Sequence, residues 1–239
     1  MTSKAGRNVG WAIAGLVGLA LGALLWSPPD WLVDSLATLR PGCLYRARLR
    51  APLIALTIDD GPDPVSTPLI LAELGRHDAH ATFFLISSRL AGREQLVRDL
   101  VAAGHELGNH LTQDKPSIRL TPAEFEQALL EAHGVLAAYG PVTWLRPASG
   151  WYSRAMIDII HRHQYRCALG SIYPFDATLP SRRFALSYIR RNARPGAIVI
   201  LHDGGARGLR TAWVLRRVLP ALRAKGYRLV TLSDLIGAA

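Results

Sequence analysis

Two adjacent carboxylates, Asp59 and Asp60, stand at the end of the apolar run Leu53–Ile58 and are followed at once by Gly61 and Pro62. Neighbouring negative charges repel each other, and burial strengthens the repulsion. An Asp-Gly pair is also common in turns, so the doublet taken alone is compatible with a plain acidic turn. Its interpretation depends on which other polar residues the chain brings to the same place.

Four more residues that could transfer protons, bind a metal or orient a charge follow later apolar runs, in the order His110, Arg146, Asp176 and His202. His110 follows the segment HELG, Arg146 ends the segment TWL, and His202 ends the segment AIVIL. In parallel α/β folds, chemistry gathers at the carboxyl ends of the strands. The recurrence of polar residues at strand ends therefore predicts one site that also contains the carboxylate doublet.

Short β-branched runs alternate with helical patterns from Cys43 onward. Strands are predicted at Leu53–Ile58, Ala81–Ile86, Glu106–Gly108, Thr143–Leu145, Cys167–Gly170, Ala197–Leu201 and Arg228–Thr231. Helices are predicted at Thr67–Arg76, Glu94–Ala103, Pro122–Tyr139, Arg154–His163, Phe184–Asn192, Thr211–Lys225 and Ser233–Ile236. Alternation of this kind predicts an α/β fold with right-handed crossovers, here an irregular, incomplete (β/α) barrel with about seven parallel strands.

The amino-terminal segment predicts a separate unit. Val9–Trp26 carries no charge and, at about 18 residues, is at the lower limit for spanning a bilayer core. We expect a division into residues 1–26 as an N-terminal hydrophobic helix, residues 27–42 as a linker, and residues 43–239 as a catalytic domain. The helix would be a membrane signal anchor that places the domain outside the cytoplasm, or a signal peptide whose cleavage would secrete the protein.

The composition of the chain indicates which classes of binding partner it suits. The chain has 239 residues, 49% of them hydrophobic, with a formal net charge of +10. Such a basic balance suits an anionic surface, but no nucleic-acid motif is present, so we expect no nucleic-acid partner. Cys43 and Cys167 are too few for a disulfide framework, and either a single bond or two separate buried thiols is compatible with the sequence.

The motifs resemble those of the polysaccharide deacetylase family, carbohydrate esterase family four. The family sequence T-F-D-D-G-P corresponds to residues 57–62, with Ile58 in place of Phe. Its second motif, H-S/T-x-x-H, corresponds to His110 through Asp114, with Asp114 at the second histidine position.

Three later family motifs also have counterparts. R-x-P-Y-G corresponds to residues 146–150, with Ser149 in place of Tyr. The motif built around an aspartate corresponds to Asp176 without the usual Trp, and L-x-H corresponds to residues 200–202. The resemblance covers roughly residues 43–235 and includes a specific first motif.

The resemblance implies a divalent metal held by Asp60, His110 and Asp114. The i, i+4 spacing of the last two would place both on one face of a helical turn. Zn²⁺ is the metal we expect, with Mn²⁺ or Co²⁺ as alternatives, because a carboxylate in place of an imidazole favours harder metals.

The resemblance also implies catalytic and substrate-binding roles. Asp59 would be the general base, oriented by Arg146, and His202 would be the general acid, held by Asp176. The backbone N–H of Ser149 would stabilise the oxyanion, and Leu201 would contact the acetyl methyl group.

The predicted function is a metal-dependent hydrolase that removes N-acetyl groups from amino-sugar polysaccharides, peptidoglycan or chitin-like, in the cell envelope. Deacylation of a lipid-linked sugar and O-acetyl ester hydrolysis are alternatives with the same chemistry. A non-catalytic glycan-binding relative is a third alternative, because the second, third and fourth motifs are altered.

Overall fold

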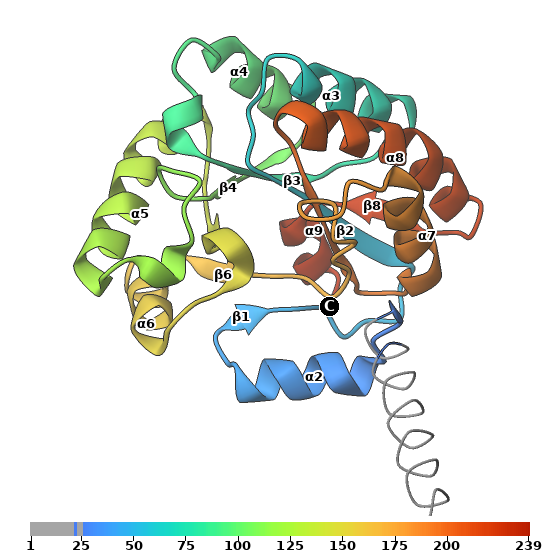
Figure 1. Cartoon of the computed structure of the whole chain (residues 1–239), viewed down its shortest axis with the longest axis horizontal. Helices are drawn as coiled ribbons and strands as arrows, with labels where there is room; N and C mark the ends of the chain where they lie inside the picture. Colours follow the sequence, from blue (N-terminus) through green and yellow to red (C-terminus); the bar gives the residue numbers. More distant parts are fainter. Residues whose placement is uncertain (1–21, 23–25) are drawn as a thin grey trace, which may run out of the picture.

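The computed structural model describes Gly22 and residues 26–239. Its strands are β1 (Cys43–Leu44), β2 (Leu53–Asp59), β3 (Thr82–Leu85), β4 (Glu106–Asn109), β5 (Trp144–Leu145), β6 (Arg166–Ala168), β7 (Ile198–His202) and β8 (Arg228–Val230). Its helices are α2 (Asp30–Leu39), α3 (Ser66–Arg76), α4 (Glu94–Ala102), α5 (Pro122–Leu136), α6 (Arg154–Arg162), α7 (Arg182–Asn192), α8 (Gly205–Arg223) and α9 (Leu232–Gly237). Figure 1 shows the strands in the middle of the molecule with helices around them.

The strands form one sheet in the order β1-β6-β5-β4-β3-β2-β7, with β8 also paired to β2, and every ladder is parallel. Segments near the two ends of this order also meet, through the isolated bridges Ile172–Val199 and Arg46–Ala197. The predicted parallel α/β fold with a curled, incompletely closed sheet is confirmed. The described sheet has eight strands, not seven, because β1 is two residues long and has no periodicity to reveal it.

Alternate residues of the strands point to opposite faces of the sheet. On β2, Leu53 and Ala55 belong to a small buried cluster, while Ile54, Leu56 and Ile58 belong to the larger core. The small cluster also takes one or two residues from most other strands, among them Phe84, Trp144, Ala168, Ile198 and Val230. Asp59 has the same parity as Leu53 and Ala55, so the strand directs it to the face of the small cluster.

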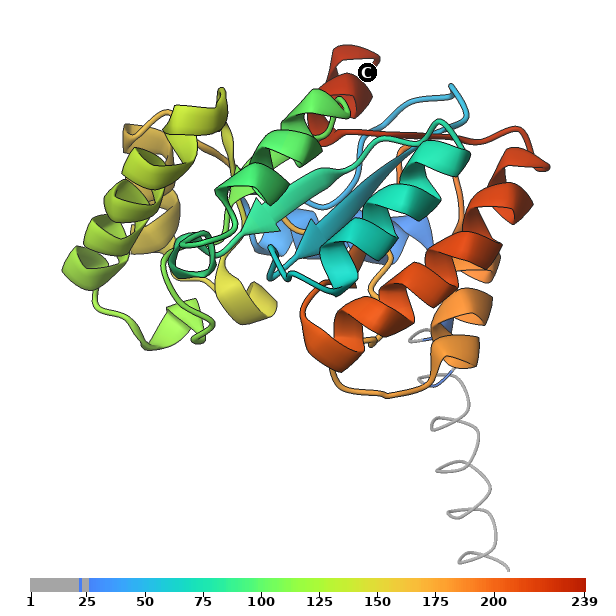
Figure 2. The same ribbon diagram turned by 90° about the horizontal axis from the view of Figure 1, so that it is seen from above.

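The helices begin and end close to their predicted bounds, with one important exception. The capping box of Thr121 and Glu124 starts α5 as expected. Helix α8, however, begins at Gly205, six residues before the predicted Thr211. A Cβ atom at Gly208 would lie 2.2 Å from Ser66 Oγ, so glycine lets the first turn of α8 pack against α3. Figure 2 shows these two helices side by side.

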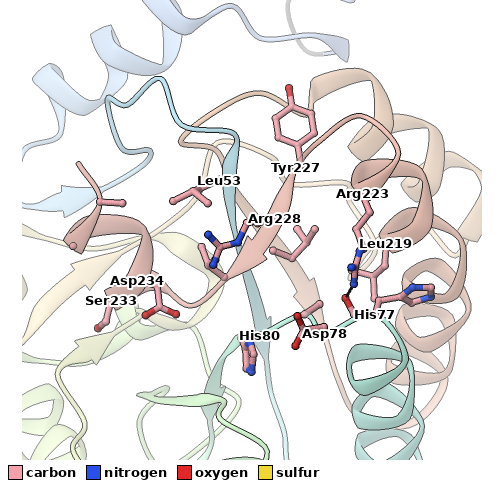
Figure 3. Close-up of a pocket in the computed structure, with 15 residues that line it drawn as sticks. Leu53, His77, Asp78, His80, Leu219, Arg223, Tyr227, Arg228, Ser233 and Asp234 are labelled. Carbon is pink, nitrogen blue, oxygen red and sulfur yellow. Dashed lines mark hydrogen bonds between the residues drawn. The ribbon is translucent and has the colours of Figure 1, made fainter.

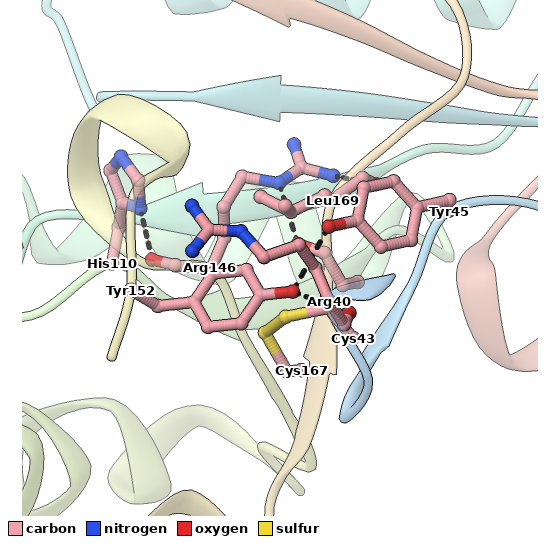
Figure 4. The surroundings of a disulfide bond; sticks show 9 residues. Arg40, Cys43, Tyr45, His110, Arg146, Tyr152, Cys167 and Leu169 are labelled. Atoms are coloured by element: carbon pink, nitrogen blue, oxygen red, sulfur yellow. Dashed lines mark hydrogen bonds between the residues drawn. A yellow bond between two sulfur atoms is a disulfide. The ribbon is translucent and has the colours of Figure 1, made fainter. Parts of the chain in front are cut away.

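A disulfide joins Cys43 of β1 to Cys167 of β6, which are register partners in the sheet. This settles the alternative between a bond and two separate thiols. Nearby, the hydroxyls of Tyr45 and Tyr152 lie 2.9 Å apart, and Tyr152 donates to the carbonyl of Arg40 at 2.7 Å (Figure 4). The short strand β1 is therefore held by a covalent bond and by hydrogen bonds.

The predicted membrane-anchored placement is corrected. Within the part of the chain that the structure describes, no helix is long and apolar enough to cross a membrane. The segment on which that prediction fell, Val9–Trp26, lies outside the described residues except for Gly22 and Trp26. The predicted linker contains α2, whose Asp30 and Asp34 form ion pairs with Arg46 at 2.9 and 2.8 Å. The domain boundary at residue 43 stays a prediction.

Candidate active site

Asp59 is the last residue of β2 and is 3% exposed. Its Oδ1 accepts a hydrogen bond from Arg146 Nη1 at 2.6 Å, which is also an ion pair. Arg146 has several other partners, because it also donates to Thr57 Oγ1 and to the carbonyls of Ala168 and Leu169, and lies 4.2 Å from the ring centre of Phe84. A guanidinium held by that many partners fixes the orientation of the Asp59 carboxylate.

Asp60 leaves the line of the strand, because its φ of +71° lies in the left-handed region. Its side chain contacts two basic groups: Oδ1 lies 3.4 Å from His110 Nε2, and Oδ2 lies 3.0 Å from Arg207 Nη1. Burial raises the pKa of Asp60, but the His110 hydrogen bond and the charges of His110, His202 and Arg207 outweigh it and hold the pKa at about 2. The two neighbouring carboxylates are thus separated by the backbone and neutralised by different partners.

His110 follows β4 and is 4% exposed. Its Nδ1–H donates to the carbonyl of Arg146 at 2.7 Å (Figure 4). Its other ring nitrogen, Nε2, lies 3.4 Å from Asp60 Oδ1. Burial lowers the pKa of His110, but the Asp60 hydrogen bond and the charges of Asp59 and Asp60 raise it above its ordinary value. A ring nitrogen bound to a backbone carbonyl is the usual arrangement for a metal-binding histidine, because it fixes the tautomer.

Asp114 is not placed as its spacing predicted. Residues 112–115 form a bend, not a helical turn, because Leu111 adopts a φ of +63° and donates its N–H to Asn109 Oδ1 at 2.8 Å. Asp114 Oδ2 contacts Arg89 Nη2 at 3.1 Å and Arg207 Nη2 at 3.4 Å. Among the residues that the structure describes, no group of three His, Cys, Asp or Glu side chains is arranged to hold a metal. The expected helical pairing of His110 with Asp114 is therefore wrong, and the role of Asp114 as a metal ligand stays a prediction.

His202 ends β7, where it is the register partner of Asp59 on β2. Asp176 accepts from both its Nδ1 at 3.0 Å and its backbone N–H at 2.9 Å. Burial lowers the pKa of His202, but the Asp176 hydrogen bond and the charges of Asp176, Asp59 and Asp60 raise it above its ordinary value. Because Nδ1 is bound, Nε2 is the nitrogen able to meet a substrate.

The two predicted substrate-binding residues differ in placement. Ser149 lies in the 3₁₀ turn Ala148–Gly150, is exposed, and has a φ of +67°. Leu201 is fully buried in the larger core, on the face of β7 opposite to the His202 side chain. The predicted contact of Leu201 with an acetyl group stays a prediction that this burial does not favour.

Three residues of the site were missed by sequence reasoning. Arg207 contacts Asp60 and Asp114, and Arg89 contacts Asp114 and donates to the carbonyl of Asp60. Tyr173 packs edge-on to His202, with ring centres 6.0 Å apart. Burial raises the pKa of Tyr173, and the charges of Asp176, Asp59 and Asp60 raise it further. The only sequence signal for Tyr173 was its position three residues before Asp176, and the two arginines carried none.

The donor set is chemically suited to one divalent cation. A buried carboxylate and a buried imidazole, Asp60 and His110, face each other, and the imidazole has the required tautomer. The guanidinium of Arg207 contacts both Asp60 and Asp114, so both carboxylates already have a positively charged partner. The described residues thus fit a cation at Asp60 and His110, with Asp114 tied to arginines.

A cavity of about 760 Å³ lies at the opposite end of β2 from Asp59. It is lined by the starts of β2 and β8, including Leu53 and Arg228, and by the loop with His77 and His80 (Figure 3). Arg223 donates to the carbonyl of His77 at its edge. None of the predicted site residues lines it, so its volume does not bear on the site at the carboxyl ends of the strands.

Comparison with known proteins matches residues 46–168 to the polysaccharide deacetylase family. Over 187 residues the chain is 34% identical to a peptidoglycan-N-acetylglucosamine deacetylase of Bacillus cereus, covering 77% of this chain and 88% of that protein. It is 34% identical over 191 residues to a chitooligosaccharide deacetylase of Azorhizobium caulinodans, covering 74% and 90%.

Solved structures give the same result. A peptidoglycan deacetylase of Bacillus subtilis matches with a TM-score of 0.71 at 27% identity, covering 79% of this chain and 91% of that one. A CE4 family pseudoenzyme from Bacillus anthracis matches with a TM-score of 0.76 at 25% identity, covering 83% and 70%. On the strength of its motifs, its fold and these matches, the chain belongs to the polysaccharide deacetylase family.

Proposed function

We propose that this protein is a hydrolase that removes N-acetyl groups from amino-sugar glycans. The observation that carries the proposal is the pairing of Asp59 with His202. They are register partners on adjacent parallel strands, and each is held by its own charged partner, Arg146 or Asp176. Asp59 as the proposed general base and His202 as the proposed general acid would thus flank one place at the carboxyl ends of the strands.

Amide hydrolysis needs a proton removed from water and a proton given to the leaving nitrogen. Asp59 accepts the proton from the water whose oxygen attacks the acetyl carbon, and Arg146 keeps the carboxylate aimed at that water. His202 then donates a proton to the nitrogen as the carbon–nitrogen bond breaks, releasing acetate and a free amine. Asp176 holds Nδ1 of His202, so the proton leaves from Nε2.

Two further features would support the reaction. The backbone N–H of Ser149 is proposed to stabilise the oxyanion, which does not require the family's tyrosine side chain. Asp60 and His110, with Asp114 as a proposed third ligand, would hold a divalent cation that polarises the carbonyl and the attacking water when it is bound. Zn²⁺ is the proposed ion, with Mn²⁺ or Co²⁺ as alternatives.

The proposed substrates follow from the relatives, which act on peptidoglycan N-acetylglucosamine and on chitooligosaccharides. A non-catalytic glycan-binding role is a second candidate, because Asp114 is turned to Arg89 and Arg207 and the fold is also that of a pseudoenzyme. Acetyl esters of glycans are a further substrate for the same residues.

The test is acetate release by the full chain from N-acetylated chitooligosaccharides and from peptidoglycan, with acetylated xylan as the ester control. Each assay is run untreated, after chelation, and after addition of Zn²⁺, Mn²⁺ or Co²⁺. We expect release from an amino-sugar glycan that chelation abolishes and one of the metals restores. Glycan binding without acetate release under any of these conditions would refute the enzyme and support the binding role.

A further inference from the structure

The guanidinium of Arg207 lies between two of the residues predicted to bind the metal. Nη1 is 3.0 Å from Asp60 Oδ2, and Nη2 is 3.4 Å from Asp114 Oδ2. We propose that the guanidinium of Arg207 competes with the divalent metal for these two carboxylates, so that the metal binds only when the guanidinium moves away from Asp60. The proposal rests on the proposed function, since it concerns the same site.

The carboxylates of Asp59, Asp60 and Asp114 each have a guanidinium partner. In the part of the chain that the structure describes, three carboxylates pair with three guanidinium groups, as Asp59 with Arg146, Asp60 with Arg207, and Asp114 with Arg89. A divalent cation would add two positive charges within a few ångströms of the Arg207 guanidinium, and like charges at that distance repel strongly where water is excluded. Loss of Arg207 would instead leave a net negative site that attracts the ion.

The ion pair is built so that one partner is fixed and the other can leave. The Asp60 side chain is 5% exposed and is also held by His110, whereas the Arg207 side chain is 30% exposed. Arginine can turn its charged head into water while its stem stays on the protein surface. Metal uptake would therefore exchange one cation for another at Asp60 without leaving that buried carboxylate unpaired.

Asp114 explains why the guanidinium stays in place. A carboxylate here accepts from Arg207 and Arg89 together, whereas the neutral imidazole that the family motif has at this position would offer them no negative charge. The glycine at position 208 also helps to position Arg207, because it lets the first turn of α8 approach Ser66 and so brings Arg207 to the site. Asp114 and Arg207 thus form one arrangement.

In the opposite role, Arg207 would orient Asp60 for the metal and so assist its binding. The two roles predict opposite signs for the effect of removing the guanidinium. Competition predicts tighter metal binding by Arg207→Gln, whereas assistance predicts weaker binding. Metal affinity, measured without any substrate, therefore distinguishes them.

The experiment is calorimetric titration of the chelator-treated full chain with Zn²⁺ and with Mn²⁺. We expect Arg207→Gln to bind the ion roughly 10- to 100-fold more tightly than the wild type, as removal of one nearby positive charge implies. Arg216→Gln is the matched control, because Arg216 is exposed on the same helix and its loss changes the net charge equally. The control should bind like the wild type.

A second variant tests whether the ion binds at Asp60. Adding Asp60→Asn to Arg207→Gln should abolish the gain in affinity, because the released carboxylate is the proposed ligand. Unchanged or weaker binding by Arg207→Gln, or a gain that survives Asp60→Asn, would overturn the proposal. These outcomes do not depend on acetate release. The proposed competition can therefore be refuted while the proposed deacetylase activity stands, and the activity can be refuted while the competition stands.

Discussion

Replacing Asp59 by asparagine should remove both a catalytic base and one half of a buried ion pair. Asp59→Asn keeps the size of the side chain and one oxygen that can accept from Arg146. It removes the negative charge that faces a guanidinium only 2% exposed. We therefore expect two separate losses, one of turnover and one of stability.

The magnitude of each loss follows from the contacts. Removing one partner of a buried ion pair typically destabilises by about 3–5 kcal/mol, because the other charge is left unpaired. Arg146 keeps Thr57 Oγ1 and the carbonyls of Ala168 and Leu169 as acceptors. We therefore expect the loss of folding free energy to be at the lower end of that range, about 3 kcal/mol. For a chain of this size that loss lowers Tm by about 6–12 °C. Loss of the base should lower kcat by about 10²–10⁴-fold.

Urea unfolding and acetate release measure the two effects, with Asp158→Asn as control, since Asp158 is an exposed aspartate of α6. The control should match the wild type in both. In the double variant with Arg146→Met, the two stability losses should not add, because no unpaired charge remains. Wild-type stability and near-normal acetate release by Asp59→Asn would refute the reasoning.

Three further variants test other parts of the molecule. His202→Ala should lower kcat by about 10²–10⁴-fold at unchanged metal content. Normal turnover by a variant with the same measured metal content as the wild type would show that His202 is not the general acid. Burial, followed by the charge of His80, lowers the pKa of His105 from 6.5 to about 4, so the unfolded chain takes up a proton at higher pH than the folded one. The free energy of unfolding should therefore fall by up to about 3 kcal/mol from pH 6.5 to pH 4, and His105→Asn should flatten that slope in urea unfolding. Asp114→Ala, made together with Arg207→Gln, should bind metal less tightly than Arg207→Gln alone; equal affinity would show that Asp114 is not a ligand.

Most of the strands, and the polar residues at their ends, could be predicted from the sequence. Apolar runs identify strands locally, and a parallel sheet brings all carboxyl ends to one edge wherever the helices between them pack. This is why Asp59, Arg146 and His202 were expected close together, and in the structure Asp59 pairs with Arg146 and is the register partner of His202. The capping box of α5 is local for the same reason.

The remaining features depend on contacts between distant segments. The i, i+4 spacing of His110 and Asp114 has meaning only on a helix, and the left-handed Leu111 turns the chain away before one can form. The disulfide between Cys43 and Cys167 joins residues 124 positions apart, through pairing of a two-residue strand that has no pattern of its own.

Arg207 reaches Asp60 because α8 starts early against α3, where a glycine at position 208 permits close packing. The sequence by itself therefore determined the fold class, the family and the residues at the strand ends, since these follow from local periodicity and from short motifs. Only the tertiary structure decided which cation faces Asp60 and what Asp114 binds, because a long side chain is placed by the packing of its helix and not by its position in the chain.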